Sequence, residues 1–66
     1  MYKNQVLVNG KERTLRAQST DDRVIAYERH NKAVAWAEDY SITFGRSVTV
    51  NLFKDEDCLL SVDYEY

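Results

Sequence analysis

The dipeptide Asn9-Gly10 is the feature that most restricts how this chain can fold. Both residue types accept the positive φ angles of a type I′ turn, which joins the two strands of a tight β-hairpin. Apolar residues alternate with polar ones on both sides of the turn, namely at Tyr2, Val6 and Val8 before it and at Leu15 and Ala17 after it. The sequence therefore predicts an opening hairpin with strands at about residues 2–8 and 11–18.

A helix is predicted to follow the hairpin, at about residues 20–38. The run Ser19-Thr20-Asp21-Asp22 offers hydroxyl and carboxylate groups that cap the first amides of a helix and suit the positive end of its dipole. The residues of one helical face then recur at spacings of three and four: Ala26, Tyr27, His30, Ala33, Val34 and Ala37. The polar run at 28–32 leaves an alternative open, in which the helix breaks near Asn31 and Val34 and Trp36 begin a strand.

The last third of the chain has the alternating pattern of β-strands. We expect strands at residues 40–44, 48–52 and 60–64, a turn or bulge at Gly45-Arg46, and a turn at residues 54–57. At 66 residues the chain has no room for a second domain. The prediction is one α+β domain over residues 1–66, with element order ββαββ or ββαβββ and the helix packed on one face of an antiparallel sheet.

The opening of the chain resembles a known family. The segment Met1-Tyr2-Lys3, the turn Asn9-Gly10-Lys11 and a helix led by Thr20 that contains Ala33 and Ala37 are similar to the immunoglobulin-binding domains of protein G. More broadly, the order of elements resembles the β-grasp fold. The resemblance covers about the first forty residues and implies a topology, and no functional residue is carried over from it.

Side chains that support catalysis or metal binding are few in this sequence. Cys58 is the only cysteine and His30 the only histidine, so they cannot supply the four ligands of a structural zinc site. No serine lies in a G-x-S-x-G setting, no glycine-rich phosphate loop is present, and residues 55–57 lack the spacing of a calcium loop. We expect no enzymatic activity, no cofactor and no metal, with His30 as a partly buried structural residue.

Trp36 is the candidate partner-binding residue. Together with Ile25, Arg29 and Lys32 it lies on a helical stripe beside the stripe predicted to face the core. Trp and Arg are the residue types most enriched among interface hot spots. We expect these four residues to contact a protein partner, and the chain to act as a small regulator or inhibitor of a larger macromolecule. In the alternative, the helix is rotated and Trp36 belongs to the core.

Self-association is a second expectation. A chain this short, without a disulfide or a metal, builds a marginal core, and residues 33–37 are apolar nearly all round the helix. We therefore expect a homodimer. The unpaired Cys58 and the lack of a targeting leader favour the cytoplasm. The longest apolar run has five residues, against the roughly 18–20 that a membrane span needs, so we expect no membrane insertion.

Charge is unevenly divided along the chain. Residues 1–33 hold seven basic and four acidic residues, whereas residues 34–66 hold two basic and seven acidic ones. This division leaves further hypotheses open: a nucleic-acid binder, an acidic mimic of nucleic acid through residues 55–65, or a structural subunit that assembles with itself. The binder would use Lys11, Arg13, Arg16 and Arg23. The net charge of −2 and the pI near 5.2 disfavour nucleic acid as the partner.

Overall fold

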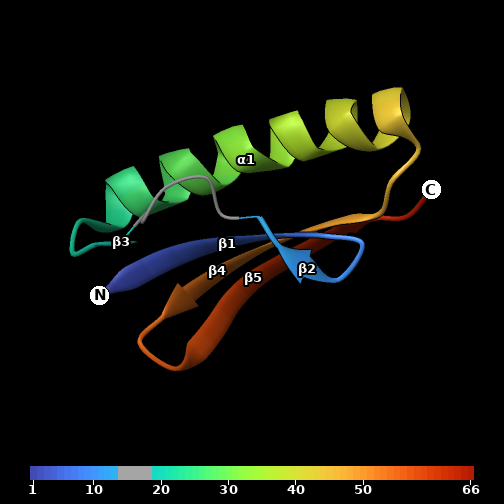
Figure 1. Cartoon of the computed structure of the whole chain (residues 1–66). Coiled ribbons are helices and arrows are strands. Elements are labelled where there is room, and N and C mark those ends of the chain that lie inside the picture. The colour runs from blue at the N-terminus through green and yellow to red at the C-terminus, as the bar shows by residue number, and fades with distance from the viewer. Residues whose placement is uncertain (14–18) are drawn as a thin grey trace.

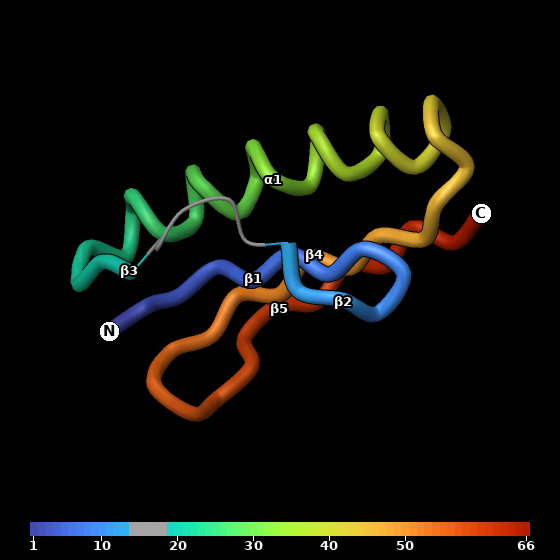
Figure 2. The backbone as a smooth tube through the Cα atoms, viewed as in Figure 1, coloured from blue at the N-terminus to red at the C-terminus, as the bar shows by residue number. Residues whose placement is uncertain are grey.

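The computed structural model describes residues 1–13 and 19–66, in which helix α1 (Arg23–Phe44) lies across one face of an antiparallel sheet (Figure 1 and Figure 2). The strands in this part of the chain are β1 (Tyr2–Val8), β2 (Lys11–Glu12), β3 (Ser19–Thr20), β4 (Val48–Lys54) and β5 (Asp57–Tyr64). The predicted α+β class, with the helix on one sheet face, is confirmed.

The strands lie in the order β2-β1-β4-β5, and β3 pairs with the opposite end of β1 from β2. The central strands β1 and β4 run antiparallel over their whole length, with Val6 opposite Val50. This antiparallel pairing differs from a β-grasp sheet, which has a parallel central pair. The two edges of the sheet are β2 on one side and β5 on the other.

The predicted turn at Asn9-Gly10 is confirmed, with φ angles of 50° and 81°. It brings β1 and β2 together with Val8 opposite Lys11. The second strand was expected over residues 11–18, and the described part of it is the short β2. Residues 14–18 lie outside the described residues.

The core lies between α1 and the sheet. The sheet contributes aliphatic side chains, and the helix contributes small ones that let the two layers approach closely. The buried apolar residues are Val8, Val48, Val50 and Leu52 from the sheet and Ala26 and Ala37 from the helix. Asn4 is also buried and its Nδ2 donates a hydrogen bond of 3.2 Å to the Ala26 carbonyl, which ties β1 to the first half of α1.

Helix α1 is longer than predicted and has a defined cap at each end. The Asp22 side chain accepts a hydrogen bond from the Ile25 amide at the start. At the end, Gly45 adopts φ 62° and its amide donates to the Ser41 carbonyl at 2.9 Å. The strand predicted at residues 40–44 is therefore wrong, and so is the proposed break near Asn31.

Side-chain packing explains why residues 40–44 are helical despite their alternating pattern. Ser41 is buried against the sheet one turn after Ala37, and Tyr40 stacks on aromatic rings one turn before and one turn after it. Residues four positions apart are neighbours on a helix and not on a strand. These contacts outweigh the local β propensity of residues such as Ile42 and Thr43, which is strongly dependent on context.

Candidate functional site

The stripe predicted to bind a partner lies on one exposed side of α1. We call this set the outer flank, and its residues are Ile25, Arg29, Lys32 and Trp36. The two apolar members are partly open to solvent, with Ile25 at 39% and Trp36 at 38% exposure. At this exposure Trp36 is a boundary residue and not a buried core residue.

Three aromatic rings form a continuous stack at the C-terminal half of α1. The ring centroids of Trp36 and Tyr40 are 4.8 Å apart, and those of Tyr40 and Phe44 are 4.6 Å apart. Phe44 is 61% exposed. Sequence reasoning missed this aromatic stack because it assigned two of the rings to a strand. The spacing of four residues between successive rings was the signal that could have revealed it.

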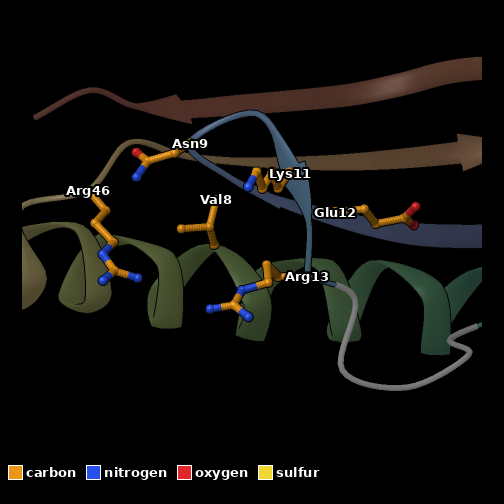
Figure 3. Close-up of a pocket in the computed structure, with 6 residues that line it drawn as sticks. All are labelled: Val8, Asn9, Lys11, Glu12, Arg13 and Arg46. Carbon is orange, nitrogen blue, oxygen red and sulfur yellow. The ribbon is translucent and has the colours of Figure 1, made fainter.

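A concave surface lies beside the aromatic stack, where the β1–β2 hairpin meets the segment that connects α1 to β4 (Figure 3). We call it the basic pocket. Its volume is about 560 Å³, and it is lined by Val8, Asn9, Lys11, Glu12, Arg13 and Arg46. Three of the six lining residues are cations and one is an anion, so the pocket carries a net positive charge in a chain of net charge −2.

Hydrogen bonds hold the two walls of the basic pocket in place. The Asn9 amide donates to the Ser47 carbonyl at 2.8 Å, and the Asn9 Oδ1 accepts from the Ser47 amide at 3.1 Å. The guanidinium of Arg46 donates to the Tyr40 hydroxyl at 3.3 Å. The pocket and the aromatic stack are therefore parts of one surface, joined through Tyr40 and Arg46.

The cations proposed for nucleic-acid binding do not all gather at this surface. The structure brings Lys11 and Arg13 together, and Arg46 joins them although the sequence hypothesis did not include it. Arg23 lies at the other end of α1, with its guanidinium 5.4 Å from the centre of the Tyr27 ring. Arg16 lies outside the described residues.

Acidic residues gather at the opposite edge of the sheet from the basic pocket. The edge strand β5 carries Asp57 and Asp63, and Thr49 donates a hydrogen bond to Asp63. Next to β5, the Met1 ammonium donates to Asp55 at 2.8 Å, and this bond and charge lower the pKa of the Asp55 carboxyl. The basic pocket and these acidic residues therefore lie at opposite edges of the sheet, and such a separation of charge can orient the molecule toward charged partners.

His30 is buried between helix and sheet, with 2% of its surface exposed. Among residues 1–13 and 19–66 its Nδ1 has no hydrogen-bond partner, and burial lowers the pKa of the imidazole because the charged form is poorly solvated there. Cys58 is a free, exposed thiol. Within the described residues no three His, Cys, Asp or Glu side chains lie close enough together to hold a metal ion.

The described residues contain no helix that is both long and apolar enough to cross a membrane. Comparison with protein families, curated proteins and solved structures gave no match to this chain.

Proposed function

We propose that this chain is a non-enzymatic protein-interaction module, a small regulator or inhibitor that binds a larger partner through the outer flank Ile25, Arg29, Lys32 and Trp36. The observation that carries the proposal is the row of rings that continues this flank. Trp36 stands beside two more aromatic side chains on a side of α1 that the sheet leaves partly uncovered. Rigid aromatic rings with cations beside them are the composition of interface hot spots.

The stacking of the rings supports a preformed binding surface. Tyr40 is held between Trp36 and Phe44 and also accepts a hydrogen bond from Arg46, so its ring has little freedom to lose on binding. A side chain that is already ordered contributes more of its contact energy to affinity, because the entropic cost of ordering it is smaller. Exposed rings at the C-terminal end of α1 also leave apolar surface that folding of the domain does not bury.

The same outer flank is the proposed contact in a symmetric homodimer when no foreign partner is bound. A small core without a disulfide or metal gains stability from such a contact. We place the protein in the cytoplasm, since the exposed free thiol of Cys58 suits a reducing compartment.

The test is affinity capture with the tagged full chain, followed by mass spectrometry, on three proteins in parallel: the wild type, Trp36→Ala and Ile42→Ala. Ile42 lies on the same helix, is 72% exposed and is not a member of the outer flank, which makes it the matched control. We expect the captured partner to be lost with Trp36→Ala and kept with Ile42→Ala. Truncation of a hot-spot residue costs about 2 kcal/mol or more, roughly a thirtyfold loss of affinity.

Circular dichroism melting of each variant accompanies the capture, so that a loss of binding is separated from a loss of fold. Proteins captured equally by the wild type and by a folded Trp36→Ala variant would overturn the proposal. A partner lost with both variants would show that the contact spreads around the helix and is not centred on the outer flank.

A further inference from the structure

The basic pocket holds three cations that form no ion pair within the described residues, beside one carboxylate, that of Glu12. Among residues 1–13 and 19–66, no ion pair within 4.0 Å joins Lys11, Arg13 or Arg46 to an acidic side chain. Glu12, which also lines the pocket, contacts Lys3 at 4.0 Å. Figure 3 shows Lys11 and Arg13 reaching toward Val8 and the Arg46 side, while the carboxylate of Glu12 points the opposite way.

The chemistry of the pocket is that of a carboxylate receptor. A guanidinium presents a planar fork of donors that matches the two oxygens of a carboxylate. Arg13 comes from the hairpin and Arg46 from the segment after α1. A carboxylate bound between these two walls therefore has a guanidinium group on each side. The Arg46 fork is already positioned by the Tyr40 hydroxyl. The floor at Val8 is apolar, which suits the aliphatic part of a Glu or Asp side chain.

We infer that the basic pocket binds carboxylate side chains of an acidic peptide segment in the protein partner. This inference rests on the proposed function and adds the chemistry of the partner to it. The acidic segment lies in the pocket and continues over Tyr40 to the rest of the aromatic stack, because the bond between Tyr40 and Arg46 makes these two surfaces adjacent. Acidic residues fix the orientation of the partner, and apolar residues beside them bury the rings.

The rings themselves favour a peptide over a nucleic acid. Single-stranded nucleic acid binds when bases stack on open aromatic faces. Tyr40 has neighbouring rings on both sides, at 4.6 and 4.8 Å, so its faces are occupied within the protein. The rings are tilted against one another by 33° and 41°, and such an arrangement suits the aliphatic and aromatic side chains of a protein.

The test uses a blocked hexaglutamate peptide as the probe and the fluorescence of Trp36, the single tryptophan, as the reporter. The full-length wild type is compared with the double variant Arg13→Gln/Arg46→Gln. The matched control is Arg23→Gln/Lys54→Gln, which removes the same charge away from the pocket. We expect the pocket variant to bind the peptide at least about tenfold more weakly and the control variant to bind within about twofold of the wild type. All four cationic side chains are exposed, so both variants keep the core intact.

Three parallel titrations decide among other ligands: a hexalysine peptide, inorganic phosphate and an oligothymidylate. Tighter binding of the oligothymidylate, with the same loss in the pocket variant, would overturn the peptide in favour of nucleic acid. Saturation by phosphate at the same concentration as hexaglutamate would reduce the pocket to a small-anion site and overturn the inference. Absence of hexaglutamate binding would overturn it as well. Lys11→Gln, the mildest change at the pocket, repeats the comparison if the double variant unfolds.

The inference and the proposed function fail in different ways. A partner whose capture depends on Trp36 but is unchanged in Arg13→Gln/Arg46→Gln refutes the acidic segment and leaves the interaction module standing. A partner whose capture depends on the pocket and not on Trp36 refutes the outer flank as the contact.

Discussion

Asn9 and Ser47 exchange two hydrogen bonds across 38 positions of the chain. The Asn9 side-chain oxygen accepts one of them, and the Asn9 backbone N–H donates the other. The pair joins the hairpin turn to the segment that follows α1, and thereby sets the distance between the two walls of the basic pocket. The same residue has φ 50°, a conformation that Asn accepts more readily than most residue types. One side chain therefore serves the turn and the pocket together.

Replacement of Asn9 separates these two roles. Asn9→Ala removes the side-chain acceptor and puts at this left-handed position a residue that adopts the conformation less readily than Asn, so we expect about 1–3 kcal/mol of lost stability in urea unfolding. Asn9→Gly keeps the backbone conformation and loses only the side-chain bond, which predicts a loss of about 1 kcal/mol. Equal stability of both variants and the wild type would show that the contact with Ser47 contributes nothing to the fold.

The contact between helix and sheet depends on small side chains. Ala37 is fully buried among Val8, Val48 and Val50, so Ala37→Leu forces the layers apart. We expect a loss of about 1–3 kcal/mol, measured by thermal melting. Ala35→Leu makes the same change at an exposed position of α1 and serves as the control, with an expected effect within about 0.5 kcal/mol. A melting temperature that Ala37→Leu leaves unchanged would contradict this close packing.

The local turn and the fold class could be predicted from sequence, because both depend on short-range chemistry. Asn9-Gly10 specifies its turn almost alone, and the small residues at positions 26, 33 and 37 mark the buried face of α1. The end of the helix could not be placed in this way, since residues 40–44 alternate like a strand and their aromatic neighbours decide the outcome. The basic pocket was also missed, because Arg46 meets Lys11 and Arg13 only through tertiary contacts.

Buried His30 makes the stability of the fold depend on pH. Burial lowers the pKa of the folded imidazole below the value of 6.5 that it has in the unfolded chain. Below pH 6.5 the unfolded chain therefore binds a proton at His30 more readily than the folded chain does. The contribution of His30 to the free energy of unfolding is complete above this pH and falls as the pH drops. The slope is at most about 1.4 kcal/mol per pH unit.

Urea unfolding at about pH 7.5 and about pH 5.5 measures this effect, since the window lies above the range in which most carboxyl groups titrate. We expect the wild type to lose stability between the two values and His30→Leu to lose much less. A wild type and a variant with the same pH dependence would assign the effect to other groups.

The partial exposure of Trp36 predicts a moderate effect on the fold. A fully buried tryptophan loses about 3–5 kcal/mol on truncation to alanine. Trp36 is 38% exposed and is supported on one side by Tyr40, so Trp36→Ala should cost about 1–2 kcal/mol in thermal or urea unfolding. A loss of the size of a core truncation would mean that the residue acts in the fold and not at an interface.

Salt distinguishes the symmetric dimer at the outer flank from the binding of an acidic segment at the basic pocket. In a symmetric dimer each copy presents the same patch, so Arg29 and Lys32 of one copy lie near those of the other and repel them. Raising the salt from about 50 to about 500 mM screens this repulsion and should strengthen the dimer, whereas it should weaken the binding of an acidic segment. Sedimentation equilibrium at high micromolar concentration measures the effect of salt on the dimer.

A mass of 7.7 kDa at both salt concentrations would refute the dimer. A dimer that weakens with salt would place the basic pocket against the acidic β5 edge of a second copy, head to tail, in place of the symmetric contact.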